Sequence, residues 1–350
     1  ATVASGADFD TCVENVDIGG PGMLRASAKN HNAVTVVTSP NQYAELIEEL
    51  KSNDGQTTIE LRRRFAAAAF SLSAHYDGAI ASYFSQQLGS DLPTVTRTYA
   101  VEHKLKYGCN PNQTPAALCR IGDAKLPFEV LNGRPGYINL LDAANAWQLV
   151  FELKRALGTA AAASFKHVSP AGAAVAVQLS DVEFQAYEME GRKLTLTDSA
   201  LAYLRARQAD PMSSFGDFAA LSDVVDKDTA MVLKTEVSDG IVAPGYEPEA
   251  LEILKAKKGG NFIVLQANAD YVAPQSEYRE VFGMGFMQRR NDCVITKESL
   301  AKVATTKVTE LSEDAQRDLL VASIAIKYTQ SNSVAYAKNG QVIGVGAGQQ

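Results

Sequence analysis

The first part of the chain combines a short apolar run with two helical patterns. Residues 33–38 read AVTVVT, and this β-branched run predicts a buried strand. Ser39 and Pro40 follow as the N-cap and first-turn proline of a short helix. A longer helix is then predicted, because Thr57 and Glu60 have the spacing of a capping box. Its apolar positions recur close to the helical period, at Leu61, Phe65, Leu72, Tyr76, Ile80 and Phe84.

The pattern changes after a polar stretch at residues 89–98, and we place a domain boundary near residue 95. Beyond it, short apolar runs alternate with helical segments. The runs predict strands at residues 128–131, 160–165, 218–221, 240–243 and 261–265, and the helical spacings predict helices at residues 139–157, 199–208, 227–236, 247–257 and 312–326. A hairpin is predicted around an Asn339-Gly340 turn, with strands at residues 334–337 and 341–345. These elements indicate an α/β protein, with one domain over residues 1–95 and a second over residues 96–350.

Composition and charge narrow the class of protein. The 350 residues are 46% hydrophobic and 21% charged, which is typical of a folded protein with more than one domain. Lysine and arginine number 33 against 40 acidic residues, a net charge of −7, whereas nucleic-acid-binding domains usually carry a basic excess. The basic run Arg62-Arg63-Arg64 is typical of a solvated helix face. No apolar run reaches the roughly 18 residues of a membrane span, so we expect neither nucleic acid nor membrane as a partner.

The cysteines indicate a reducing compartment and no metal site. Cys12, Cys109, Cys119 and Cys293 form no C-x-x-C pair, and no histidine has metal-ligand spacing from them. We therefore expect free, buried thiols and a cytoplasmic location. The sequence also lacks the G-x-x-x-x-G-K-[ST] phosphate loop and the H-x-E with P-C-x-x-C signature of zinc deaminases.

The strongest chemical signal is Lys166 beside His167, at the end of the predicted alanine-rich strand. The Pro170-Ala171-Gly172 run that follows indicates a glycine-rich turn, a place where α/β proteins often carry chemistry. A histidine titrates near neutrality and a lysine stabilises negative charge, so this pair can remove a proton and stabilise a developing anion. The alternative is a structural histidine beside an exposed lysine, and the residues alone leave both open.

Three further segments carry polar residues among small ones. Residues 212–218 contain a glycine that permits close backbone approach to a ligand, or they form a plain turn before a strand. Residues 327–333 are rich in hydrogen-bonding side chains and suit an amide-bearing ligand or a capped polar loop. Residues 16–31 place three glycines before a helical stretch with Arg25 and Lys29, a pattern that suits a bound anion or a simple helix cap.

Five strings, taken in order, resemble one family. They are DIGGPGMLRASAKNH, SFKHVSPAGAA, SSFGDF, EVSDGIVAPGYEPEAL and IKYTQSNSVAYAKNGQVIGVGAGQQ. They are similar to the bifunctional phosphoribosylaminoimidazolecarboxamide formyltransferase and IMP cyclohydrolase family, and the resemblance covers essentially the whole chain.

The resemblance implies a fold, two reactions and their partners. Residues 1–95 would be the remnant of an open parallel α/β cyclohydrolase domain, and residues 96–350 part of a cytidine-deaminase-like mixed α/β formyltransferase domain without zinc. The first reaction would transfer a formyl group from 10-formyltetrahydrofolate to the 5-amine of aminoimidazole carboxamide ribonucleotide (AICAR). The second would close the product ring to inosine monophosphate with loss of water, completing de novo purine biosynthesis. A homodimer, purine ribonucleotide and folate as small-molecule partners, and a structural potassium ion in some members are also implied.

The matching motifs imply roles for individual residues. His167 is implied as the base that accepts a proton from the substrate's 5-amine, with Lys166 stabilising the developing charge and Asn332 positioning the reacting groups. In the first domain, Lys29 is implied in proton transfer during ring closure and Asp17 in contact with the nucleotide. The implied ribonucleotide-binding residues are Lys106, Tyr107, Asn139, Phe215, Gly216 and Asp239.

One segment departs from the family's commonest pattern, which reads L-R-Y-G-x-N-P-H-Q. Here Lys106 replaces the arginine and Asn112 replaces the histidine. Lysine keeps the positive charge but loses the bidentate fork, so we expect a phosphate contact without the arginine's geometry.

The resemblance also implies that the family extends beyond both ends of this chain. Two hypotheses therefore stand: an enzyme of both reactions, and a nucleotide-binding or dimerisation module that turns over nothing.

Overall fold

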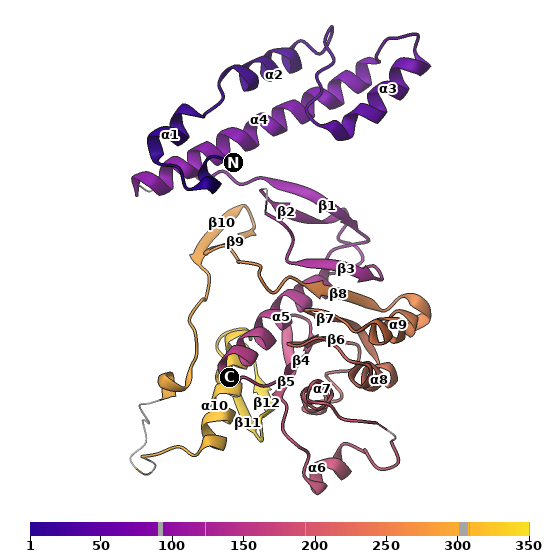
Figure 1. Cartoon of the computed structure of the whole chain (residues 1–350), viewed down its shortest axis with the longest axis vertical. Coiled ribbons are helices and arrows are strands. Elements are labelled where there is room, and N and C mark those ends of the chain that lie inside the picture. Colours follow the sequence, from indigo (N-terminus) through magenta and orange to yellow (C-terminus); the bar gives the residue numbers. More distant parts are fainter. Residues whose placement is uncertain (90–93, 123, 193, 301–306, 308, 350) are drawn as a thin grey trace. The chain divides into compact units, whose positions relative to one another are not determined.

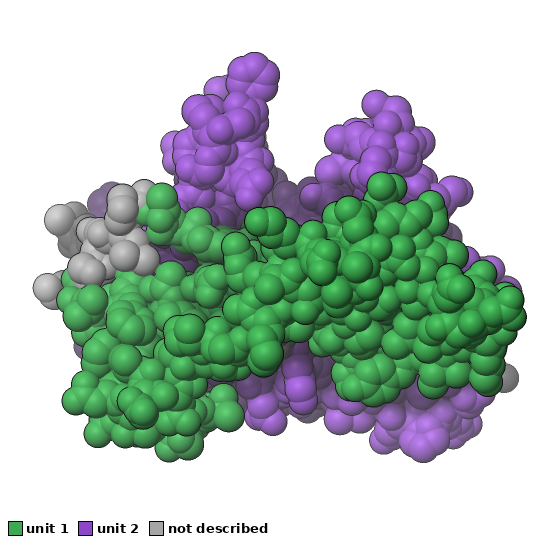
Figure 2. All heavy atoms as spheres, turned by 90° about the horizontal axis from the view of Figure 1, so that it is seen from above, with its two compact units in different colours: residues 1–102, 119–124 green, residues 103–118, 125–350 purple. Residues whose placement is uncertain are grey.

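The structure is a computed structural model that describes residues 1–350 except 90–93, 123, 193, 301–306, 308 and 350. The chain divides into two compact units, coloured separately in Figure 2. Unit 1 comprises Ala1–Glu102 and Cys119–Ala124, and unit 2 comprises His103–Leu118 and Lys125–Gln350. The assignment of two domains with different activities, divided near residue 95, stays a prediction.

Unit 1 is mainly helical (Figure 1). Its helices are η1 (Val3–Ser5), α1 (Phe9–Glu14), α2 (Gly19–Lys29), η2 (Pro40–Gln42), α3 (Tyr43–Ser52) and α4 (Ile59–Leu88). Ser39 caps its helical turn as predicted, with Pro40 inside it. The cap of α4 is Thr58 rather than Thr57, whose hydroxyl oxygen lies instead 2.7 Å from that of Thr35. Among the residues described, no helix is both long and apolar enough to cross a membrane.

The strand predicted at residues 33–38 is wrong. A strand needs a neighbouring strand for its hydrogen bonds, and this segment has none in the described part of unit 1. Its backbone bonds locally instead: the Val34 amide donates to the Asn30 carbonyl over 2.9 Å, and the Thr38 amide donates to the Gln42 side chain over 2.8 Å. The described residues of unit 1 thus form mainly helices, together with the parts of β1 (Tyr99–Leu105) and β2 (Ala116–Ile121) that belong to this unit. The parallel α/β architecture of the first domain stays a prediction.

Unit 2 is built on an eight-stranded mixed sheet in the order β11-β12-β5-β4-β6-β7-β8-β3. Its strands are β3 (Phe128–Asn132), β4 (Ala161–Lys166), β5 (Ser169–Val175), β6 (Asp217–Leu221), β7 (Ser238–Ala243), β8 (Ile263–Ala267), β11 (Val334–Lys338) and β12 (Gln341–Gly346). The helices of unit 2 are α5 (Tyr137–Leu157), α6 (Asp181–Ala186), α7 (Asp198–Gln208), α8 (Lys227–Thr235), α9 (Pro248–Ala256), η3 (Lys257–Gly260), η4 (Lys297–Leu300) and α10 (Glu313–Lys327). The strands and helices predicted beyond residue 95 are confirmed, with ends within a few residues.

Helices cover both faces of this sheet (Figure 1). Helices α5 and α10 share one core cluster with Ala161, Ala163 and Phe165 of β4. Helices α7, α8 and α9 pack on the other face, where Ala162 of the same strand is buried. The alternation follows from the two-residue period of a strand. Unit 2 is therefore a mixed α/β structure, and its likeness to the cytidine-deaminase fold stays a prediction.

No strand pattern marks β5, because most of its residues are serine, proline, alanine and glycine. Its position is nevertheless central, between β12 and β4. A β carbon at Gly172 would lie 2.0 Å from the carbonyl oxygen of Ala206 in α7. The glycine is therefore needed for the close approach of this helix to the sheet.

Two hairpins lie outside the main sheet. They are β1 (Tyr99–Leu105) with β2 (Ala116–Ile121), and β9 (Ser276–Val281) with β10 (Met284–Arg289). Most of their residues are exposed or half-buried, so they lack the clear alternation of buried and exposed positions that marks a strand in a sequence.

The four cysteines are free thiols. Cys12 is buried, whereas Cys109 and Cys293 are exposed, so the prediction of buried thiols is wrong for those two. Among the described residues, histidine, cysteine and acidic side chains form no group of three or more that could hold a metal ion.

Several strands of the sheet begin or end at the same side of the sheet, and we call this side the site edge. Strand β4 is antiparallel to β5 and β6, while β6, β7 and β8 are parallel, so the end of β4 lies with the starts of the other four. Strand β3 also ends at the site edge, because its last residue, Asn132, pairs with Val264 near the start of β8. The chain then continues into α5. Strand β11 starts towards the same edge, because Val334 pairs with Gly346 and β12 runs antiparallel to β5.

Candidate active site at one edge of the sheet

Lys166 and His167 stand where β4 turns into β5. His167 and Val168 form a two-residue turn in which both φ angles are positive, at 52° and 63°. Such turns usually carry asparagine and glycine, since other side chains are strained at positive φ. The predicted glycine-rich turn after His167 is therefore wrong: the chain reverses at once, and Gly172 lies inside β5. The tight turn leaves the His167 side chain exposed at the site edge.

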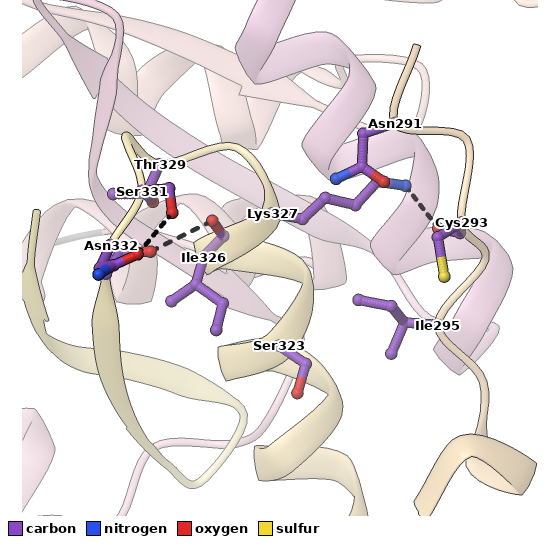
Figure 3. Close-up of a pocket in the computed structure, with 10 residues that line it drawn as sticks. Asn291, Cys293, Ile295, Ser323, Ile326, Lys327, Thr329, Ser331 and Asn332 are labelled. Carbon is purple, nitrogen blue, oxygen red and sulfur yellow. Dashed lines mark hydrogen bonds between the residues drawn. The ribbon is translucent and has the colours of Figure 1, made fainter. Parts of the chain in front are cut away.

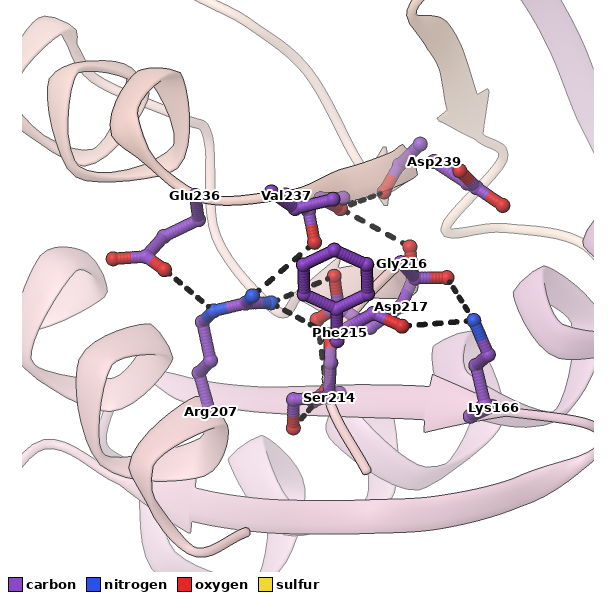
Figure 4. Close-up of polar contacts among 12 residues, drawn as sticks. Lys166, Arg207, Ser214, Phe215, Gly216, Asp217, Glu236, Val237 and Asp239 are labelled. Carbon is purple, nitrogen blue, oxygen red and sulfur yellow. Dashed lines mark hydrogen bonds and ion pairs between the residues drawn. The ribbon is translucent and has the colours of Figure 1, made fainter. Parts of the chain in front are cut away.

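The ammonium group of Lys166 is held by the loop before β6 (Figure 4). It donates to the carbonyl oxygens of Phe215 and Gly216, each over 2.9 Å. Gly216 has a φ of 74°, and a β carbon there would lie 2.9 Å from the Lys166 nitrogen. A lysine has three N–H donors, so one remains for a bound molecule.

A buried ionic cluster lies beneath this loop (Figure 4). Arg207 of α7 pairs with Asp217 over 3.0 Å and with Glu236 over 2.8 Å. It also donates to the carbonyl oxygens of Ser214 and Val237, over 2.8 Å and 3.1 Å. Burial raises the pKa of Asp217, and the Arg207 charge opposes that rise. The cluster ties the loop before β6 to the start of β7, which fixes the carbonyl groups that hold Lys166.

Asp239 and Asn139 reach the site edge from neighbouring elements. Asp239 is the second residue of β7, and its carboxylate pairs with Lys258 over 2.5 Å. Asn139 lies in the first turn of α5, where its side-chain oxygen accepts the Gly136 amide over 3.0 Å. Its amide nitrogen is a hydrogen-bond donor at the same edge.

Asn332 lies in the loop before β11, also towards the site edge. It lines a cavity of about 710 Å³ together with Asn291, Thr329 and Ser331 (Figure 3). Lys327 also lines it, but its ammonium pairs with Glu152 over 2.8 Å and is buried. Three strand spacings of about 4.8 Å separate β11 from β4, so these two strands lie roughly 14 Å apart in the sheet.

Lys106 and Tyr107 belong to the loop between β1 and β2. The Lys106 ammonium lies 5.8 Å from the centre of the Tyr107 ring, at the outer limit of a cation–π contact. The loop is braced by Gln113, whose carbonyl accepts the Gly108 amide over 2.8 Å and whose side chain accepts the Asn110 amide over 2.7 Å.

Lys29 and Asp17 are not brought together by unit 1. Asp17 precedes α2 and Lys29 is its last residue, so roughly 16 Å of helix separates them. The Asp17 carboxylate accepts the Gly20 amide over 3.0 Å. This bond supports the helix-cap alternative for the glycine-rich segment. Lys29 is exposed.

The sequence analysis missed two buried residues that support the site edge. Arg207 lies in a helix whose residues are almost all buried, and Asp142 lies in α5, where its carboxylate oxygen accepts the Val168 amide over 2.6 Å. Both are buried. The short polar spacing from Asn139 to Asp142 inside an apolar helix is the one pattern that points to the second residue.

The fold and the edge together define a mixed α/β protein with a lysine–histidine pair where one strand of its central sheet ends. The family model described as "AICARFT/IMPCHase bienzyme" matches residues 27–350, and the chain belongs to this family. Its relatives include proteins named "Bifunctional purine biosynthesis protein PurH" from Rhodospirillum rubrum and Caulobacter vibrioides, 36% and 33% identical over 355 and 363 residues. A relative of the same name from Cereibacter sphaeroides is 35% identical. All of this chain is covered, and it spans 62% of the length of each relative.

Proposed function

We propose that the protein transfers a formyl group from 10-formyltetrahydrofolate to the 5-amine of AICAR and closes the product to inosine monophosphate. The observation that carries the proposal is the meeting of Lys166, His167 and Gly216 at one sheet edge in a chain of this family. Formyl transfer needs a base, a group that stabilises an oxyanion, and a surface that holds the nucleotide. The site edge offers candidates for all three.

His167 acts as the base. The amine nitrogen of AICAR attacks the formyl carbon, and the exposed imidazole of His167 accepts the proton that this nitrogen loses. The carbon–nitrogen bond to the folate then breaks, and the folate nitrogen takes up a proton. Lys166 stabilises the negative charge on the formyl oxygen with its third N–H, while Phe215 and Gly216 hold the other two.

The ribonucleotide binds along the same edge. Phe215 is 64% exposed, and its ring offers an apolar face to the aminoimidazole ring. Asp239 accepts hydrogen bonds from the sugar hydroxyls, and Asn139 donates a hydrogen bond to the nucleotide from its side-chain amide. Lys106 and Tyr107 bind the nucleotide from the loop between β1 and β2, and Asn332 positions the reacting groups.

The potassium ion that the resemblance implies would lie against residues 329–333, four of which line the cavity of about 710 Å³. Thr329, Ser331 and Ser333 supply hydroxyl oxygens, and this stretch has no carboxylate. A neutral oxygen set suits a weakly charged cation better than zinc, which favours nitrogen and sulfur ligands. When bound, the ion would hold this loop and so the position of Asn332.

Ring closure is assigned to unit 1. Lys29 takes part in proton transfer and Asp17 contacts the nucleotide. Since the length of α2 separates them, they act on different parts of one ligand. We propose that the protein works as a homodimer.

A second candidate function is a nucleotide-binding or dimerisation module without turnover.

Isothermal titration with AICAR, followed by a formyl-transfer assay with 10-formyltetrahydrofolate, separates the two candidates. The enzyme binds and turns over, whereas the module binds only. Absence of AICAR binding would contradict the enzyme and the nucleotide-binding module, and would leave only a module for dimerisation.

A further inference from the structure

Asp142, in the second turn of α5, is a buried carboxylate at the site edge. The residue is 4% exposed, and its Oδ1 accepts a hydrogen bond from the Val168 amide over 2.6 Å. Val168 is the second residue of the turn whose first residue is His167. The carboxylate is therefore bonded directly to the turn that carries the proposed base.

This turn adopts a conformation that its residues disfavour. A β-branched residue such as Val168 is rarely found at positive φ, and strained residues persist only where their surroundings hold them. The hydrogen bond from the Val168 amide to Asp142 supplies such a restraint.

The same sheet contains the same device at its opposite edge. The turn of the β11–β12 hairpin is Asn339-Gly340, also with positive φ at both residues. Both amides donate to the carboxylate of Asp318 in α10, over 2.9 Å and 2.7 Å. An aspartate on a covering helix thus holds each hairpin turn, but only the turn held by Asp142 carries a histidine.

We propose that Asp142 is a positioning residue for formyl transfer: by accepting the Val168 amide, it fixes the turn and aims the His167 imidazole along the site edge. The inference rests on the proposed function for the role of His167. Asp142 acts through the turn and does not touch the substrate.

The groups around Asp142 suit a carboxylate that accepts hydrogen bonds. Burial, the largest effect, raises the pKa of Asp142 to about 6, and the Val168 amide and the charges of His167 and Lys166 oppose this rise. These three opposing groups favour the carboxylate form, whose oxygens can only accept hydrogen bonds.

The first test compares three variants in steady-state formyl transfer. Asp142→Ala removes the acceptor, Asp142→Asn keeps an acceptor oxygen, and Asp318→Ala removes the matching restraint from the other turn. We expect Asp142→Ala to lower kcat roughly 10–100-fold with little change in the KM for AICAR, because a small misplacement of a reacting group costs about that much. Asp142→Asn should keep most of kcat, and Asp318→Ala should lower the Tm but not kcat. A wild-type kcat in Asp142→Ala, or an equal loss in both Asp142 variants, overturns the proposal.

The second test follows hydrogen exchange of the Val168 amide by NMR and needs no catalysis. Exchange should be slow in the wild type and in Asp142→Asn, and roughly tenfold or more faster in Asp142→Ala, because an amide that loses its partner opens more often. Unchanged exchange in Asp142→Ala overturns the proposal. A wild-type protein that binds AICAR without formyl transfer contradicts the proposed function instead, since exchange reports the contact between Asp142 and Val168 by itself.

Discussion

The ammonium nitrogen of Lys166 lies 2.9 Å from the carbonyl oxygen of Gly216, and a β carbon at that glycine would stand equally close to it. The lysine that we propose to stabilise the formyl oxygen is thus placed by backbone that only glycine can provide. The position of Lys166 depends on the loop before β6 as much as on β4.

Gly216→Ala should damage both the fold and the site. Alanine is strained at a φ of 74°, and its methyl group would displace the Lys166 ammonium. We expect a loss of about 1–2 kcal/mol in the free energy of unfolding, with at least a tenfold fall in formyl transfer. Gly344→Ala is the control, because a β carbon there meets nothing within 4 Å. Wild-type activity in Gly216→Ala would show that the loop does not place Lys166.

Arg207→Met tests the buried cluster. Removing one partner of a buried ion pair leaves Asp217 uncompensated, which typically costs about 3–5 kcal/mol. Urea unfolding measures this loss. The control is Arg64→Met, whose pair with Glu45 is exposed and should contribute roughly 0–1 kcal/mol. Equal losses of stability in the two variants would mean that the buried cluster contributes no more to the free energy of unfolding than an exposed ion pair.

Asp142 should make stability depend on pH. Its folded pKa of about 6 lies above the ordinary 3.8, so the folded state favours the protonated form. This stabilisation is complete below pH 3.8 and is lost as the pH rises through about 6. The wild type should therefore lose stability relative to Asp142→Asn between these pH values, measured by urea unfolding at each pH. A constant difference between the two proteins would contradict the raised pKa.

Lys29→Ala should separate the two reactions. Lys29 lies at the end of α2 in unit 1, whereas Lys166 and His167 lie in unit 2. We expect slower ring closure and formyl transfer within about twofold of wild type, since losing a proton-transfer group affects only the step it serves. Separate assays of the two steps check this, and an equal loss in both would argue against the division.

Most strands of unit 2 could be predicted because a buried strand appears in the sequence as a short run of apolar residues. Residues 218–221 and 240–243 are short apolar runs, and both form central parallel strands. Residues 33–38 are also a short, largely apolar run, but they have no neighbouring strand in the described structure. In contrast, β5 pairs on both sides although Val175 is its one β-branched residue. Composition alone does not report pairing, because the partner comes from elsewhere in the chain.

The site could be predicted only in part. The pattern of residues 164–174 placed Lys166 and His167 at a strand end, which the structure confirms, but the tight turn after them depends on a bond to α5. Arg207 and Asp142 look like surface residues of helices in the sequence, since their partners lie far along the chain. The length of α2 already implied that Asp17 and Lys29 stand far apart.

The most direct test of the central claim is single-turnover formyl transfer by His167→Ala at saturating AICAR. We expect AICAR to bind as in the wild type and the transfer rate to fall about 10²–10⁴-fold, the usual effect of losing a general base. A wild-type rate with AICAR bound would contradict the role given to His167 and, with it, the assignment of the site edge.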